Sequence, residues 1–240
     1  MPDKIKINER EQQLLKSDVL ALKGVAGSGK SQLLAYKTNT LLSEDRTALL
    51  LVAGIYFSNT PIQEQIMSNL RLDYSFEDLI DVLETIGERD NRIVPILIDA
   101  LNETWNSKLW KTGFPLMIER IRNAPMVKLV VSYRTEYEKN LFTDSIIKEI
   151  TEGDIATIVH RGFQDNRITA VREFLNHYSI PFSPGEYFNT EMSNPLFLKL
   201  YCKTYDGEEV GLSTLYERLT KKVNEQVYHI HQFTTFQVIQ

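Results

Sequence analysis

A glycine-rich segment constrains this chain more than any other feature. Residues 24–31 read GVAGSGKS and match the pattern G-x-x-x-x-G-K-[ST] at every fixed position. Glycine lets successive backbone N–H groups approach phosphate oxygens closely and adopts backbone dihedrals that other residues avoid. In such a loop Lys30 reaches the β- and γ-phosphates, and the Ser31 hydroxyl is a ligand of Mg²⁺. The segment therefore predicts a site for a nucleoside triphosphate and magnesium.

The sequence on either side of the loop agrees with this interpretation. Residues 19–22 (VLAL) are apolar and predict a strand, and residues 32–37 predict a helix. A strand–loop–helix arrangement points the N-terminus of the helix at a bound anion. A glycine-rich surface turn is the alternative interpretation of the motif.

Apolar runs alternate with helical patterns along the first two thirds of the chain. Runs that are apolar on both faces are typical of central strands in a parallel sheet, and their alternation with helices implies right-handed crossovers. Further strands are expected at residues 47–53, 93–98, 127–131 and 156–160, and helices at 62–70, 75–88 and 109–122. Ser75 and Asp78 predict a capped start for the second of these helices. The pattern predicts an α/β core over residues 1–164, with a mostly parallel five-stranded sheet between two helical layers.

The remaining residues, 165–240, have few strand signals. Helical patterns occur at residues 167–178, 194–204 and 212–229. Pro195 is expected to occupy the first position of the second of these helices, where proline is common. We expect a small helical lid subdomain after the α/β core.

Composition limits the classes of protein that this chain can belong to. Hydrophobic residues make up 42% of the 240 residues, and no apolar stretch approaches the roughly 18 residues that a membrane helix needs. The single cysteine, Cys202, fits a reducing compartment, so we expect a cytoplasmic protein. The net charge is −5 with both signs interspersed, so we expect no membrane partner and no direct nucleic-acid binding.

An acidic residue at the end of a neighbouring strand is the second requirement of a phosphate-binding loop. Asp99 ends an apolar run and would hold the hydration shell of Mg²⁺, with Ser31 as the direct ligand. Glu103, four residues later, is the candidate general base for the attacking water. Asn102 can form hydrogen bonds but cannot accept a proton. A turn cap for Asp99 and a solvated loop acid for Glu103 are the alternatives.

An arginine follows the fourth apolar run. Arg134 at this edge of the sheet would face the γ-phosphate and respond to its loss on hydrolysis. A surface ion pair is the alternative role.

Three segments together resemble the STAND class of signal-transduction NTPases, and most closely the NACHT-type NTPase module of the bacterial antiviral (AVAST) proteins. They are residues 24–31, the sequence ILIDALNE at 96–103, and VVSYR at 130–134. The similarity covers roughly residues 10–225. It implies a P-loop NTPase core, with Glu103 as the base and Arg134 as the sensor arginine. The segment NPLFL at residues 194–198 is similar to the lid motif whose proline packs against adenine, and the role of HRGF at 160–163 stays open.

The resemblance implies a slowly hydrolysing ATPase switch in antiviral signalling. ATP or ADP with Mg²⁺ would be bound between the sheet edge and the lid, and activation would lead to a homo-oligomer. The protein trigger and the effector domain would lie outside this chain, as would a winged-helix element. The residues expected to contact the nucleotide are Gly24, Ala26, Gly27, Ser28, Gly29, Lys30, Ser31, Gln32 and Pro195.

Three other function classes stay open at this stage. A small-molecule or nucleoside kinase would use the same loop to transfer phosphate to an acceptor, with Arg161 or Arg167 available to close over it. A non-catalytic nucleotide-binding scaffold is the second class, because Asn102 stands where many relatives have an acid. A nucleic-acid motor is the third, and the acidic charge balance disfavours it.

Overall fold

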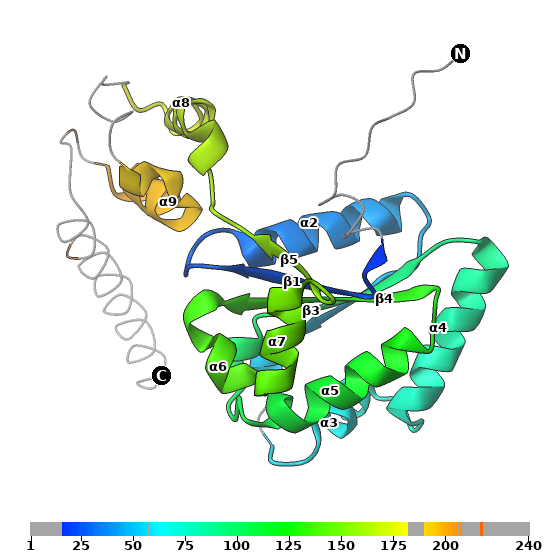
Figure 1. Cartoon of the computed structure of the whole chain (residues 1–240). Helices are drawn as coiled ribbons and strands as arrows, with labels where there is room; N and C mark the ends of the chain where they lie inside the picture. Colours follow the sequence, from blue (N-terminus) through cyan, green and yellow to red (C-terminus); the bar gives the residue numbers. More distant parts are fainter. Residues whose placement is uncertain (1–15, 57, 182–189, 206, 208–216, 218–240) are drawn as a thin grey trace, which may run out of the picture. The chain divides into compact units, whose positions relative to one another are not determined.

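The computed structural model describes residues 16–56, 58–181, 190–205, 207 and 217 (Figure 1). The chain divides into two compact units. The first contains the residues up to Ala26 and Lys30–His160, and the second contains Gly27–Gly29 and the residues from Arg161 onward. The predicted boundary between a core of residues 1–164 and a lid of residues 165–240 stays a prediction.

The first unit is built on a five-stranded sheet in which every pair of neighbours is parallel. The strands run β1 (Val19–Gly24), β2 (Leu49–Val52), β3 (Val94–Asp99), β4 (Val127–Arg134) and β5 (Ala156–Val159), and their order across the sheet is β2-β3-β4-β1-β5. The predicted α/β fold class is thus confirmed. Strand β4 is three residues longer than its apolar run predicted, so Arg134 is the last residue of the strand itself.

Helices cover both faces of this sheet, because successive side chains of a strand point to opposite faces. On β3, Ile96 and Ile98 belong to the larger core cluster, whereas Leu97 packs with Leu22 and Leu34. Helix α2 (Lys30–Ser43) covers the face with Leu97 (Figure 1). The opposite face is covered by helices α3 (Ile62–Leu70), α4 (Phe76–Asp90), α5 (Leu109–Arg122), α6 (Glu138–Leu141) and α7 (Asp144–Glu152).

Local sequence signals agree closely with the bounds of the central helices. Helices α3 and α5 begin and end at the predicted residues. Helix α4 begins after Ser75, whose hydroxyl accepts from the Asp78 backbone N–H at 3.0 Å, while the Asp78 carboxylate accepts from the Ser75 N–H at 3.0 Å. This reciprocal capping box confirms the predicted cap. Helices α6 and α7 were not predicted.

Short 3₁₀ helices connect the strands to the longer helices. In the first unit they are η1 (Ala53–Ile55), η2 (Leu101–Glu103) and η3 (Thr135–Tyr137), and η2 directly follows the residue after Asp99. In the second unit they are η4 (Gln164–Asn166) and η6 (Thr190–Ser193).

The second unit contains helices α8 (Arg167–His177) and α9 (Pro195–Thr204). Their core includes Val171, Leu175, Leu198 and Tyr201, each at most 1% exposed. Pro195 is the first residue of α9, as predicted, and the Asn194 side chain caps the helix by accepting from two backbone N–H groups. The predicted helix at residues 212–229 lies outside the described residues except for Glu217. Within the described part of the chain, no helix is long and apolar enough to cross a membrane.

Candidate nucleotide-binding site

The strand register brings distant parts of the sequence to one edge of the sheet. Gly24 at the end of β1 is paired with Arg134 at the end of β4, and Val52 at the end of β2 is paired with Asp99 at the end of β3. Because the strands are parallel, all their carboxyl ends meet at this edge, where ligands bind in open α/β sheets. The register therefore places the start of the glycine-rich loop, Asp99 and Arg134 along one edge.

The loop after β1 uses glycine where other residues would be strained. Gly27 and Gly29 have φ angles of +71° and +101°. A Cβ atom on Gly27 would lie 2.8 Å from the Leu196 Cβ and 2.9 Å from the Asn194 Oδ1, all within the second unit. Backbone conformation and close contact both require glycine at Gly27.

Lys30 is the first residue of α2 and is only 8% exposed. Its ammonium donates to the carbonyl oxygens of Gly24 and Val25, each at 2.9 Å. Burial lowers the pKa of Lys30 from its ordinary value, and the positive charge of Arg134 acts in the same direction. The nearby carboxylates of Asp99, Glu136 and Glu103 raise it. The ammonium thus feels the charges of Asp99, Glu103 and Arg134.

Asp99 is 8% exposed and is held by a hydroxyl that we did not single out from the sequence. The fully buried Ser132 Oγ donates to the Asp99 Oδ1 at 2.5 Å and accepts from the Ala100 N–H at 2.8 Å. Ala100 has φ +57°, a left-handed conformation that costs an alanine about 1 kcal/mol or more. Ser132 therefore fixes both the carboxylate and the strained turn after it. Its only signal in the sequence was a polar residue directly after the apolar run at 127–131.

Glu103 and Arg134 lie next to each other, on the exposed side of the edge. The Arg134 Nη2 and the Glu103 Oε1 are 3.5 Å apart, with side chains 38% and 51% exposed. A solvated pair of this kind contributes little to stability. Both groups therefore keep access to water, which a general base needs.

Asn102 has a structural role. Its Oδ1 accepts from the Arg134 backbone N–H at 2.9 Å and so ties η2 to the end of β4. This bond holds the turn that carries Glu103 in place beside Arg134.

The sequence analysis also missed a partly buried contact that joins Glu138 to β1 and β4. The Glu138 Oε2 accepts from the Lys23 ammonium and from the Tyr133 hydroxyl, each at 2.7 Å. Both donors are strand residues beside the pair Gly24 and Arg134, so this carboxylate ties β1 and β4 to the start of α6.

His160 follows β5 and donates its backbone N–H to the Lys23 carbonyl at 2.7 Å. Burial lowers the pKa of His160 from its ordinary value, and the charge of Lys30 lowers it further. Both effects favour the neutral form of the imidazole, and its chemical role stays open.

The oxygen donors at the edge fit a magnesium ion. Mg²⁺ is held by one or two protein oxygens together with waters and substrate phosphates, so it needs no cage of protein ligands. Asp99 supplies a buried carboxylate, and Ser31 an exposed hydroxyl in the first turn of α2. No cluster of three or more His, Cys, Asp or Glu side chains that would hold a metal by itself occurs among the described residues.

The start of α9 lies against the glycine-rich loop within the second unit. The Leu196 N–H donates to the Gly27 carbonyl at 3.2 Å, and a Cβ atom on Gly162 would lie 2.9 Å from the Pro195 Cδ. The remaining loop residues differ in burial: Ser28 is 1% exposed, whereas Ala26 and Gln32 are exposed. Contact of Pro195 with adenine stays a prediction.

Removal of the Ser132 hydroxyl is expected to weaken the candidate magnesium site. Ser132→Ala deletes a hydrogen bond to a carboxylate and leaves the Ala100 N–H unpaired, which should lower the free energy of unfolding by about 2 kcal/mol. The magnesium concentration at half-maximal ATP binding should rise severalfold, because Asp99 loses its fixed orientation. Urea denaturation and magnesium titrations measure the two effects. Ser132→Thr keeps the hydroxyl and should retain most of the magnesium affinity, and an unchanged magnesium requirement in Ser132→Ala would contradict this role.

Comparison with solved structures identifies the fold. DnaA from Aquifex aeolicus bound to AMPPCP matches with a TM-score of 0.54 and 12% identity, covering 90% of this chain and 62% of that one. Domain III of DnaA from Thermotoga maritima matches with a TM-score of 0.51 and 15% identity, covering 88% of this chain and 90% of that one. The chain has the α/β fold of P-loop NTPases. No family model matches the sequence, and no curated protein matches it.

A third match corrects one of the expectations from composition. The replication initiator DnaA bound to AMPPCP and single-stranded DNA matches with a TM-score of 0.55 and 14% identity, covering 93% of this chain and 66% of that one. This chain spans less than two thirds of the length of that structure and of the Aquifex aeolicus structure. A protein of this fold thus binds DNA directly, so our expectation of no nucleic-acid partner was wrong. Net charge over a whole chain does not report a local binding surface.

Proposed function

We propose that this chain binds ATP with Mg²⁺ and hydrolyses it slowly. The observation that carries the proposal is a buried loop lysine that feels the charge of a buried aspartate at the same sheet edge. The aspartate ends β3, which β4 separates from β1. Lys30 supplies the positive charge for the β- and γ-phosphates, and Asp99, held by Ser132, supplies the carboxylate for the magnesium shell. The AMPPCP in two DnaA structures of the same fold supports an adenine nucleotide as the ligand.

The arrangement around Glu103 supports slow turnover. A general base must accept a proton from water, and Glu103 is exposed and has a cation 3.5 Å away. The Arg134 guanidinium lies beside one oxygen of this carboxylate and competes with water for it. When a γ-phosphate draws Arg134 away from Glu103, the carboxylate becomes free to orient the attacking water.

A pairing of Arg134 with Glu103 that depends on the γ-phosphate is suited to a switch. We propose that the chain belongs to a nucleotide-controlled signalling module of the STAND type in antiviral defence. Arg134 would bind the γ-phosphate in the ATP state and pair with Glu103 after hydrolysis. The support is the run from Asp99 through Ala100 to Glu103 and the position of Arg134 at the neighbouring strand end. Nucleotide-controlled oligomerisation would be the output of this switch.

Thermal unfolding with nucleotides tests the proposal. At 100 times the dissociation constant, a ligand that binds only the folded state adds about 2.7 kcal/mol, which should raise Tm by roughly 5–10 °C for a chain of this size. ATP and ADP with Mg²⁺ should each give this shift, and GTP a smaller one. Mass spectrometry of nucleotide retained during purification should detect ADP. The absence of any shift in Tm with all three nucleotides would overturn the proposal. A single-stranded oligonucleotide should be tested in parallel, because a DnaA structure of this fold contains single-stranded DNA.

A further inference from the structure

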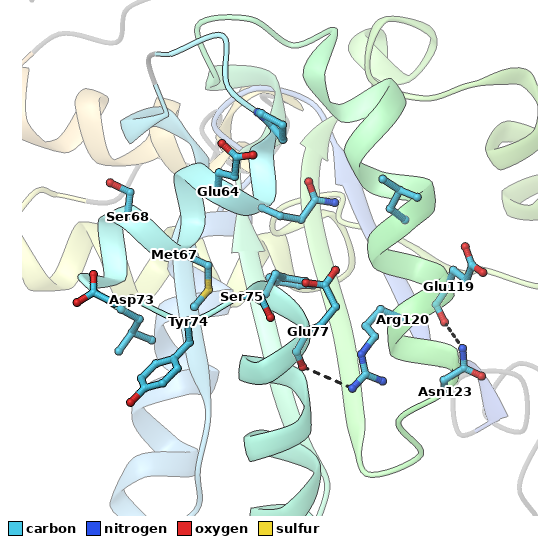
Figure 2. A pocket seen from close by; sticks show the side chains of 15 residues that line it. Glu64, Met67, Ser68, Asp73, Tyr74, Ser75, Glu77, Glu119, Arg120 and Asn123 are labelled. Carbon is cyan, nitrogen blue, oxygen red and sulfur yellow. Dashed lines mark hydrogen bonds between the residues drawn. The ribbon is translucent and has the colours of Figure 1, made fainter.

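A groove of about 770 Å³ lies on the side of the sheet covered by α3, α4 and α5 (Figure 2). Helix α3, the loop from α3 to α4, the first turn of α4 and helix α5 all contribute to its lining. We call it the α3–α5 groove. None of the residues that we assigned to the nucleotide site lines it.

Apolar side chains line the groove and remain exposed to solvent. Leu72, Tyr74 and Leu116 are 38%, 70% and 60% exposed, and Met67 and Phe76 form a buried floor. Exposed apolar residues are unremarkable when they are scattered, but a group of them in one groove indicates an interaction surface. Burial of these three side chains by a partner would favour binding.

Four carboxylates surround these apolar side chains. Glu64 lies on α3, Asp73 in the following loop, Glu77 in the first turn of α4 and Glu119 on α5. Figure 2 shows Asp73 and Tyr74 on one side of the groove and Glu119 on the other. Within the described part of the chain, none of the four side chains has a hydrogen-bond or ion-pair partner.

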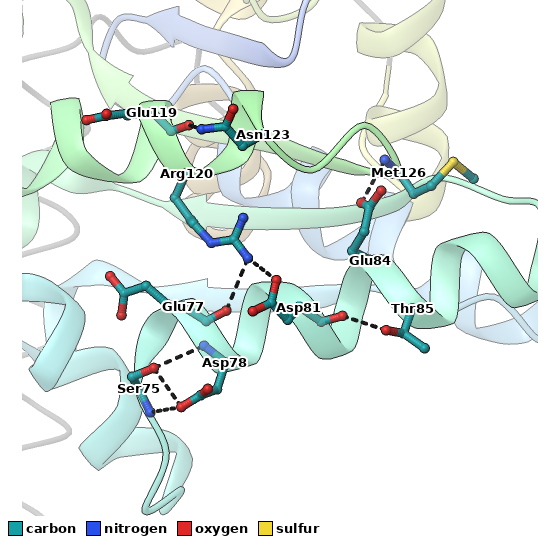
Figure 3. Close-up of polar contacts among 10 residues, drawn as sticks. All are labelled: Ser75, Glu77, Asp78, Asp81, Glu84, Thr85, Glu119, Arg120, Asn123 and Met126. Carbon is teal, nitrogen blue, oxygen red and sulfur yellow. Dashed lines mark hydrogen bonds and ion pairs between the residues drawn. The ribbon is translucent and has the colours of Figure 1, made fainter.

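Among the described residues that line the groove, only Arg120 is basic, and it is already engaged (Figure 3). Its guanidinium donates to the Glu77 backbone carbonyl of α4 at 3.5 Å. It also forms an ion pair with Asp81, which lies one helical turn after Glu77. It therefore holds α4 to α5 and neutralises Asp81. Arg120 does not pair with any of the four carboxylates around the groove.

The walls of the groove are held in place by local bonds. The capping box of Ser75 and Asp78 fixes the start of α4, and the Glu84 carboxylate of the same helix accepts from the Met126 N–H at 2.8 Å (Figure 3). The Gln63 side chain of α3 donates to the Gly113 carbonyl of α5 at 3.0 Å. A preformed groove loses little conformational freedom when a partner binds.

We propose that the α3–α5 groove is a docking site for an amphipathic, positively charged segment of a partner protein. Leucine-like side chains of that segment would cover Leu72, Tyr74 and Leu116. Lysine or arginine at its edges would pair with Glu64, Asp73, Glu77 and Glu119. This is the helix-in-groove mode of recognition, with charge complementarity at the rim.

The charges also decide against other occupants. Nucleic acid and anionic lipid carry phosphates that these carboxylates repel, so a nucleic acid that this chain binds would contact a different surface. An acidic peptide would be repelled in the same way. A basic segment gains from both the apolar floor and the rim.

A synthetic peptide of about 15 residues tests the proposal on the full chain. The probe is a fluorescent helical peptide of alanine, leucine and lysine, with leucines at helical spacing on one face and lysines beside them. A second peptide with glutamate in place of lysine is the ligand control. Fluorescence anisotropy should show at least about tenfold tighter binding of the lysine peptide, decreasing as salt is raised because salt screens exposed charges.

Variants locate this binding in the groove. Asp73→Lys with Glu119→Lys should weaken binding of the lysine peptide by about tenfold or more, since two attractions become repulsions. Glu88→Lys with Glu173→Lys changes the net charge equally at exposed positions outside the groove and should change binding less than about twofold. Leu116→Ser should weaken binding severalfold without changing any charge.

Two results would overturn the proposal. Equal weakening by the two double variants would show that only the overall charge attracts the peptide. Equal binding of the lysine and glutamate peptides would show that the four carboxylates do not discriminate between basic and acidic peptides. Lys30→Ala should bind the lysine peptide as the native chain does, because the groove and the nucleotide site share no residue; the two proposals therefore fail separately.

Discussion

Replacement of Lys30 by alanine is expected to lower the affinity for ATP by about 100-fold or more. The buried ammonium is the main positive charge that the loop presents to the β- and γ-phosphates, and its loss leaves bound phosphate without a charge-assisted partner. A loss of about 3 kcal/mol corresponds to this factor. Isothermal titration calorimetry with ATP and Mg²⁺ measures it.

A lysine further along the same helix provides the control. Lys37 is exposed on α2, so Lys37→Ala removes the same charge from the chain without touching the loop and should bind ATP as the native chain does. Lys30 also bonds the carbonyls of Gly24 and Val25, so thermal unfolding should confirm that the variant is folded. Unchanged affinity in folded Lys30→Ala would remove the basis of the site assignment.

Substitution of Glu103 by glutamine is expected to slow phosphate release by about 100-fold or more. A positioned general base contributes roughly 10²–10⁴ to a rate, and glutamine keeps the shape of the side chain but cannot take a proton. ATP affinity should change less than about threefold, because Glu103 acts on water. Phosphate release at saturating ATP, without an acceptor, gives the rate.

A nearby carboxylate, Glu136, provides a matched control for the Glu103→Gln variant. Glu136 also lies near Lys30 at the strand edge and is exposed, so Glu136→Gln removes a similar charge without removing the proposed base. It should leave phosphate release within about threefold of the native rate. Equal release by Glu103→Gln and the native chain would show that Glu103 is not the base. Phosphate transfer to a metabolite in place of free phosphate would indicate a kinase.

Much of the fold followed from local patterns. The apolar runs predicted all five strands, and α3 and α5 have the predicted bounds because their buried residues recur at helical spacing. The cap of α4 was predictable because its two bonds join residues three apart. Helix α6 was missed because it is only 4 residues long, and so short a helix depends on packing more than on pattern. Helix α7 was also missed, although it is as long as α3.

The candidate site was predicted in part. The loop and the carboxylate after an apolar run are sequence signals, and both follow directly from the chemistry of phosphate and magnesium. The residues that hold them were not predictable, because each acts across the sheet. Ser132 and Asp99 are 33 positions apart, and Asn102 and Arg134 are 32 apart, so only the register of β3 and β4 brings them together.

The sequence by itself determined the chemistry that this chain carries: a glycine loop with a lysine, an acid at a strand end and a parallel α/β pattern. These depend on residue type and short spacing, which the chain contains locally. Tertiary structure alone decided that a buried hydroxyl orients Asp99, that Asn102 is structural, and that four acids border one apolar groove. Hydrogen bonds and surfaces of this kind are made between segments far apart in the chain, and no local pattern encodes which segments meet.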